Sequence, residues 1–156
     1  MTTSPTEGSA APDFSLPIDG GGMLTLSRLR GTNVVVYFYP KADTPGCTKE
    51  STDFSRLKPE FERAGTRVVG VSADAVAAQD KFKAKHGLTV SLASDPDRGT
   101  IEAYGVWVEK TMYGKTFMGI ERATFLIDAG GRIARVWHNV KVEGHAEEVL
   151  AVARAL

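Results

Sequence analysis

An uncharged apolar run that leads through a short loop into a helical pattern constrains this chain most. Residues 34–38 (Val-Val-Val-Tyr-Phe) are β-branched or aromatic, as in a buried strand. The pattern after the loop has apolar residues at helical spacing, at Phe54, Leu57 and Phe61. A strand that feeds a helix in this way places the loop at the carboxyl end of a sheet strand, where open α/β sheets bind ligands. The feature therefore predicts an α/β fold with a functional loop.

The only cysteine of the chain lies in the first turn of this predicted helix. Thr44 suits the N-cap, and Pro45 suits the first helical position because its missing N–H would have no partner there. Cys47 then occupies the third helical position, where backbone N–H groups are unpaired and the helix dipole is positive. Both effects favour the thiolate, which is the nucleophilic form. A free cysteine is more commonly a small buried hydrophobe, and here the capped helix start favours chemistry.

The residues around this cysteine resemble a known active-site signature. Pro40-x-x-x-Thr44-x-x-Cys47 is similar to the signature of the peroxiredoxins. The longer stretch 38–50 resembles their bacterioferritin-comigratory, or Q-type, branch. The resemblance implies that hydroperoxides are reduced by a cysteine that becomes a sulfenic acid, and that Pro40 shields this thiol from water.

Two further segments carry the same resemblance. Residues 119–128 are similar to the Q-type branch at Arg122, the arginine that faces the reactive thiol in the family. Residues 11–14 (Ala-Pro-Asp-Phe) resemble the family's N-terminal entry. The family implies an α/β, thioredoxin-like fold, with a central mixed sheet flanked by helices and, here, an N-terminal β-hairpin. We expect one such domain over residues 11–156, preceded by a flexible tail over residues 1–10.

The residue types of this candidate site suit peroxide reduction. Attack of a thiolate on an O–O bond builds negative charge on oxygen, which fixed hydrogen-bond donors stabilise. The Thr44 hydroxyl, the Cys47 backbone N–H and the Arg122 guanidinium would supply such donors. Arginine stays charged and offers several planar donors. Thr44 cannot use one lone pair both as a cap and at the substrate, and the resemblance favours the catalytic role.

A geometric condition follows from the position of Arg122. This residue precedes the apolar run 123–127 and so lies at the start of a strand, whereas Cys47 follows the end of the strand at 34–39. The two side chains can meet only if these strands run antiparallel. An exposed, ion-paired arginine is the alternative. Glu50, one turn after Cys47, could orient Arg122 or be a solvated carboxylate.

The chain lacks a resolving cysteine. Many Q-type relatives carry one five positions after the first, where this chain has Thr52, so no disulfide can form within one chain. The sulfenic acid must then be resolved by an external thiol: a low-molecular-weight thiol, a thioredoxin-like or glutaredoxin-like protein, or a second subunit. A thioredoxin-type exchanger is excluded because Cys-x-x-Cys is absent.

These observations predict a thiol-dependent peroxidase for hydrogen peroxide and organic hydroperoxides, with no cofactor and no metal. The three histidines are scattered and lack helical i, i+4 spacing, which argues against a metal site. Met112, Phe117 and Met118 could form an apolar wall for larger hydroperoxides, although filling gaps in a core is the commoner role. A peroxide sensor that forms a mixed disulfide at Cys47 is the alternative function.

Composition limits the partners. Lysine plus arginine equals aspartate plus glutamate, at 19 each, which removes any general argument for a nucleic acid or an anionic membrane. No apolar run approaches the ~18 residues of a membrane span. Residues 1–12 lack the apolar core of a signal peptide, and together with the single cysteine this indicates a reducing cytoplasm. We also expect a monomer or weak homodimer.

The remaining pattern alternates strands and helices. We predict helices capped by Asp74 and Asp97, and a terminal amphipathic helix from Val142 to Leu156. Turns at 19–22 and 128–131 indicate hairpins, residues 107–118 an irregular hairpin, and residues 66–72 and 90–93 further strands.

Overall fold

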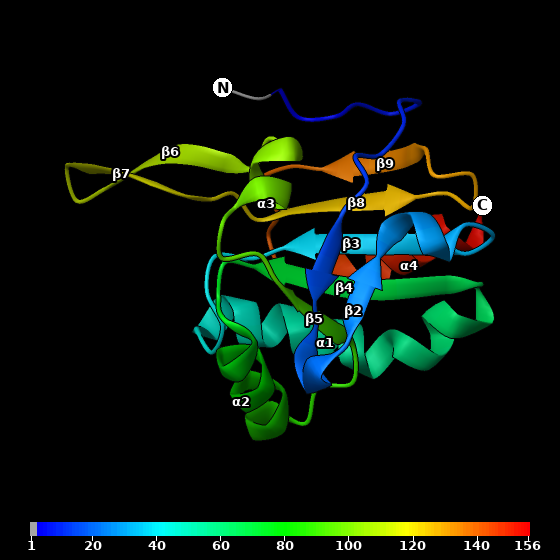
Figure 1. Cartoon of the computed structure of the whole chain (residues 1–156), viewed down its shortest axis with the longest axis horizontal. Coiled ribbons are helices and arrows are strands. Elements are labelled where there is room, and N and C mark those ends of the chain that lie inside the picture. The colour runs from blue at the N-terminus through cyan, green and yellow to red at the C-terminus, as the bar shows by residue number, and fades with distance from the viewer. Residues whose placement is uncertain (1–2) are drawn as a thin grey trace.

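A five-stranded mixed sheet lies at the centre of the computed structural model, which describes residues 3–156 (Figure 1). Its strand order is β5-β4-β3-β8-β9, in which β3, β4 and β5 are parallel and β8 and β9 are antiparallel to their neighbours. The strands are β3 (Asn33–Phe38), β4 (Thr66–Ser72), β5 (Ser91–Ser94), β8 (Ala123–Ile127) and β9 (Ile133–Trp137). The predicted α/β fold with a mixed central sheet is confirmed.

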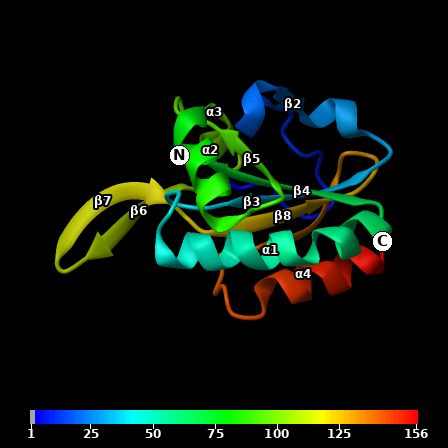
Figure 2. The same ribbon diagram turned by 90° about the horizontal axis from the view of Figure 1, so that it is seen from below.

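Helices α1 and α4 cover one face of the sheet, and helix α3 together with the N-terminal hairpin of β1 and β2 covers the other. Helices α1 and α4 lie side by side on the first face, as Figure 2 shows. Helix α2 packs at the β5 edge. The remaining elements are α1 (Pro45–Arg63), α2 (Val76–His86), α3 (Gly99–Ala103), α4 (His145–Arg154), β1 (Ser15–Pro17), β2 (Met23–Thr25) and two short 3-10 helices, Asp19–Gly21 and Leu26–Leu29. Helix α4 is therefore shorter than the terminal helix predicted from Val142 to Leu156.

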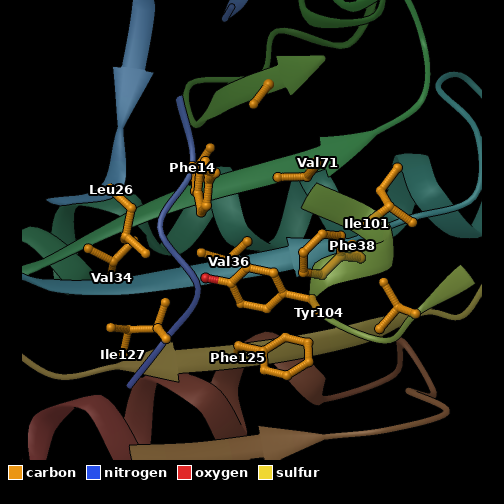
Figure 3. Close-up of a cluster of buried hydrophobic side chains, with 14 of the residues drawn as sticks. Phe14, Leu26, Val34, Val36, Phe38, Val71, Ile101, Tyr104, Phe125 and Ile127 are labelled. Atoms are coloured by element: carbon orange, nitrogen blue, oxygen red, sulfur yellow. The ribbon is translucent and has the colours of Figure 1, made fainter. Parts of the chain in front are cut away.

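Strand β3 sends alternate side chains into two separate cores, which explains why its run is apolar throughout. Phe38 points to the hairpin side, where its ring lies 5.3 Å from that of Tyr104, as Figure 3 shows. Tyr37 points to the helix side, where it stacks on Phe54 with ring centroids 4.6 Å apart. Both strand residues are fully buried. Because both faces of β3 are packed, the loop after the strand starts from a fixed position.

A two-stranded arm formed by β6 (Trp107–Met112) and β7 (Lys115–Ile120) projects from the body of the molecule (Figures 1 and 2). The irregular hairpin expected here is a regular antiparallel pair, from Trp107↔Ile120 to Met112↔Lys115. Tyr113 and Gly114 join the strands with φ values of 52° and 75°, as a primed two-residue turn requires. The hairpin predicted over residues 107–118 is therefore present, and its second strand runs two residues further, to Ile120.

The two aspartates expected to cap helices do not cap them. Helix α2 follows Ala75 without a side-chain cap, and the carboxylate of Asp74 instead accepts hydrogen bonds from the Ala42 N–H and the Ser72 hydroxyl. Helix α3 follows Arg98, also without a side-chain cap. Both predictions were wrong, and for Asp74 the reason is that segments distant in the sequence offer its carboxylate better donors.

Residues before the expected domain start contact the rest of the molecule. The Ser4 hydroxyl donates to the Tyr104 carbonyl at 2.8 Å, and the Gly8 N–H donates to the Ile133 carbonyl at 2.8 Å. The flexibility of the tail over 1–10 and the domain boundary at residue 11 stay predictions. Among residues 3–156, no helix combines the length and apolarity needed to cross a membrane.

Candidate active site

The strand arrangement satisfies the geometric condition set by the sequence. Strand β8 runs antiparallel to β3, and Ala123 pairs with Phe38 at the end of β3. Arg122, one residue before this pair, therefore lies beside the loop that leads to Cys47. Because β3 and β8 lie next to each other in the sheet, residues 75 positions apart in the sequence meet at one edge.

Arg122 bridges the cysteine and a buried carboxylate. Its Nη2 lies 3.3 Å from the Sγ of Cys47, and its Nη1 lies 2.7 Å from Oε1 of Glu50. Cys47 is fully buried, and 18% of the Arg122 side chain is exposed. Burial opposes the charge of Arg122, but Glu50 and Cys47 raise the pKa of the guanidinium above its ordinary value. A permanently charged donor thus points at the sulfur.

Glu50 orients Arg122, which is the first of the two roles considered for it. It is 1% exposed and contacts Arg122, so it is not a solvated helix-face carboxylate. Its Oε2 is buried without a hydrogen-bond partner among the described residues. Burial raises the pKa of Glu50 to about 7, and the attraction of Arg122 limits the rise. Glu50 therefore orients Arg122 through one oxygen and changes charge near neutral pH.

Thr44 lies at the N-cap of α1, but its side chain makes no capping bond. Its hydroxyl donates to the Lys41 carbonyl at 2.8 Å, so its lone pairs are not used by the helix. Of the two roles weighed for Thr44, side-chain capping is therefore absent. The Thr48 N–H bonds to the Thr44 carbonyl, which places the Cys47 N–H before it in the open first turn. Pro40 is half-buried in the loop after β3.

Two contributors to this site were missed by the sequence analysis. Lys110, on β6, is half-buried, and burial together with the positive charge of Arg122 lowers its pKa. Gly46 lies against Arg122, because a Cβ at this position would stand 3.1 Å from Nη2. No sequence signal marks Lys110, since only the path of the folded chain brings the base of the arm close enough to feel the charge of Arg122. Glycine in a first helical turn was the available signal for a close approach at residue 46.

A family model described as the AhpC/TSA family matches residues 8–136. The chain belongs to this family. Within it, the Peroxiredoxin Bcp of Xanthomonas campestris is 47% identical over 156 residues, covering 99% of this chain and 98% of the relative. A putative peroxiredoxin of Coxiella burnetii is 50% identical over 143 residues, covering 92% of this chain and 95% of the relative. These relatives place this AhpC/TSA member among the Bcp, or Q-type, peroxiredoxins.

Solved structures of Q-type peroxiredoxins match the whole AhpC/TSA chain. The Xanthomonas campestris bacterioferritin comigratory protein, studied for alkyl peroxide reduction, has a TM-score of 0.90 at 44% identity, covering 96% of this chain and 98% of its own. A Xylella fastidiosa PrxQ C47S mutant has a TM-score of 0.93 at 42% identity and 98% coverage of both chains. The Xanthomonas protein was also solved with either of two cysteines replaced by serine, whereas this chain has one cysteine.

Replacing Gly46 with alanine is expected to slow oxidation of Cys47 by hydrogen peroxide about three- to tenfold. The added Cβ, 3.1 Å from Nη2 of Arg122, must push the guanidinium away from the sulfur. Alanine also suits a helix better than glycine, by roughly 0.5–1 kcal/mol. Stopped-flow mixing should therefore show slower oxidation of Cys47, whereas urea unfolding should show an unchanged or raised free energy of unfolding. A Gly99→Ala variant, where a Cβ would have open space, serves as control. Unchanged oxidation in Gly46→Ala would contradict the close approach.

The free energy of unfolding should fall as pH rises from about 4.5 to about 7 because of Glu50. Over this range the folded protein keeps a proton on Glu50, whose pKa is about 7, while the unfolded chain has released it. The contribution is complete below the unfolded pKa and lost as pH passes the folded one, for a total on the order of 3 kcal/mol.

A Glu50→Gln variant lacks this titration and should lose less stability between about pH 5 and pH 8 than the parent protein. Urea unfolding of both proteins at several pH values measures the difference, in which titrations common to both cancel. The control is Glu62→Gln, because Glu62 is exposed on the same helix. Parallel pH profiles for Glu50→Gln and the parent would show that Glu50 is already ionised in the folded state at low pH.

Proposed function

We propose that this chain is a thiol-dependent peroxidase that reduces hydrogen peroxide and organic hydroperoxides through Cys47. The observation that carries the proposal is the charged Nη2 of Arg122, 3.3 Å from Sγ at the junction of a strand and a helix. A free cysteine kept only for packing has no need of a guanidinium whose other arm is held by a buried carboxylate.

In the proposed first step, the Cys47 thiolate attacks the terminal oxygen of the hydroperoxide. The S–O bond forms as the O–O bond breaks, which leaves a sulfenic acid on Cys47 and an alkoxide that takes a proton from water and departs as the alcohol. Arg122 lies where it can donate to the oxygens on which negative charge grows. The Thr44 hydroxyl donates to the Lys41 carbonyl in the resting site, and in this scheme it turns from that carbonyl to the peroxide. Pro40, in the same loop, limits access of water to the sulfur.

In the proposed second step, an external thiol reduces the sulfenic acid. The first thiol forms a mixed disulfide with Cys47 and releases water, and a second thiol displaces the Cys47 thiol and leaves as the external disulfide. The single cysteine supports this scheme, and Thr52, where many relatives carry a second one, is exposed. A thioredoxin-like protein, a glutaredoxin-like protein or a low-molecular-weight thiol in a reducing cytoplasm would serve.

The arm supports organic hydroperoxides among the substrates. Phe117 pairs directly with Lys110, and Met112 lies on the same face of the hairpin two residues further along. Met112 is 57% exposed and Phe117 is 44% exposed, so neither fills a gap in the core. Burial and the charge of Arg122 both lower the pKa of Lys110, so Lys110 lies near the candidate site. The apolar face that includes Phe117 and Met112 therefore extends outward from the site, where it could contact the alkyl tail of a hydroperoxide.

Peroxide consumption per chain tests the proposal. With dithiothreitol in excess, we expect sustained loss of hydrogen peroxide and of an alkyl hydroperoxide over many turnovers. Without it, one equivalent per chain should be consumed and mass spectrometry should show one added oxygen on the peptide containing Cys47. Consumption that stops at one equivalent in the presence of dithiothreitol and of a thioredoxin would favour the peroxide sensor instead.

A further inference from the structure

A cluster of polar side chains lies beneath the loop that carries the candidate site. We call Ser72, Asp74 and Gln79 the loop hub; they come from the end of β4, the turn after it and helix α2. Asp74 Oδ2 accepts a hydrogen bond from the Ala42 N–H at 2.8 Å and another from the Ser72 hydroxyl at 2.6 Å. Ala42 lies between Pro40 and Thr44, so the hub holds the middle of the loop.

The hub also holds the start of the same loop. The Tyr39 hydroxyl donates to Oε1 of Gln79 at 2.5 Å, and Nε2 of Gln79 donates to the Ser72 Oγ and to the Ala93 carbonyl, each at 2.9 Å. Burial raises the pKa of Tyr39, so its hydroxyl stays protonated and remains a donor. Tyr39, Ser72 and Gln79 are all fully buried.

The loop is therefore tied on both sides of Pro40 to one connected network. Displacing Tyr39, Ser72 or Gln79 would leave a buried polar group unpaired, so these hydrogen bonds favour one arrangement of the network. The network reaches no atom of Cys47 or Arg122. Its hydrogen bonds therefore act on the chemistry through the position of the loop backbone.

We propose that the loop hub is a positioning unit for the peroxide reaction, in which Asp74 fixes Ala42 and so sets where Thr44 and Cys47 stand relative to Arg122. The inference rests on the proposed function, because it concerns the same sulfur. Loss of the Asp74 carboxylate frees the Ala42 N–H and lets the loop drift, and a misplacement of about 1 Å in such a site costs on the order of 100-fold in rate.

Three variants test the hub. Asp74→Ala removes the acceptor, whereas Asp74→Asn keeps an oxygen for the Ala42 N–H. Asp95→Ala is the matched control, because the Asp95 carboxylate, like the half-buried one of Asp74, accepts a backbone N–H, from Ile101 at 2.8 Å, but it serves helix α3. For each protein, stopped-flow mixing gives the rate of Cys47 oxidation by hydrogen peroxide, iodoacetamide gives the rate of Cys47 alkylation, and urea gives the free energy of unfolding.

We expect Asp74→Ala to slow oxidation about 10- to 100-fold and to speed alkylation severalfold, because a loosened loop exposes the sulfur while it loses the aligned donors. Asp74→Asn should stay within about threefold of the parent protein in both rates. Asp95→Ala should leave both rates within about twofold even if it loses similar stability.

The proposal is overturned if Asp74→Ala reacts with both reagents at the parent rates, if Asp74→Asn is as slow as Asp74→Ala, or if Asp95→Ala shows the same changes. Should Asp74→Ala fail to fold, Ser72→Ala replaces it, with a slowing of about threefold expected and an unchanged rate counting against the hub. If the parent protein does not react with peroxide at all, the proposed function fails, while the alkylation rates still test the hub.

Discussion

Replacing Cys47 with serine is expected to reduce peroxide consumption to the uncatalysed rate. A serine hydroxyl is not ionised at neutral pH and is a poor nucleophile towards an O–O bond. Serine is close to cysteine in size, so the fold should persist. Peroxide loss in the presence of dithiothreitol, with circular dichroism as a folding check, measures the effect.

The matched control for Cys47→Ser is Thr52→Ser, because Thr52 is exposed on the same helix. It should turn over peroxide at the parent rate. Turnover retained by folded Cys47→Ser would mean that another group carries the reaction, and no other cysteine exists in the chain to supply it.

Replacing Arg122 with alanine is expected to slow oxidation of Cys47 by about 10²- to 10³-fold. The variant loses the donor 3.3 Å from Sγ, and it leaves Glu50 buried without a counter-charge. The pKa of Glu50 should then rise further, so that this carboxyl is neutral at pH 7 and the fold survives. Single-turnover mixing with hydrogen peroxide gives the rate constant directly.

Arg122→Lys should fall between the parent protein and Arg122→Ala. Lysine keeps the charge but lacks the planar fork that reaches Sγ and Oε1 of Glu50 at once. Arg67→Ala is the control, because Arg67 is exposed at the amino end of β4, away from the loop. Equal slowing in Arg67→Ala, or parent-like oxidation in Arg122→Ala, would remove Arg122 from the proposed mechanism.

Much of the fold and the candidate site could be predicted because the signals are local. The apolar run of β3 and the proline at the start of α1 specify their own segments, and together they place Cys47 in a first helical turn. The antiparallel relation of β3 and β8 was deduced as a condition for Arg122 to reach the sulfur, and it is confirmed. The roles of Cys47, Thr44, Arg122 and Pro40 as catalytic residues stay predictions.

Other parts of the site could not be predicted because they depend on which segments meet. Asp74 had the sequence position of a helix cap, yet its carboxylate bonds to Ala42, 32 residues away. From the sequence, Glu50 could equally be exposed to solvent or be paired with Arg122. Only the sheet register brings the arginine to it. Lys110 lies on β6 near Arg122, and no pattern in the residues of the arm predicts that position.

The sequence by itself singled out Cys47 as the candidate reactive residue and determined its local setting, since periodicity, capping preference and the helix dipole act over a few neighbouring residues. Only the tertiary structure decided which charges surround the sulfur and what holds its loop. Those choices are made by hydrogen bonds between distant segments, and each buried polar group takes the best partner that the packed chain presents to it.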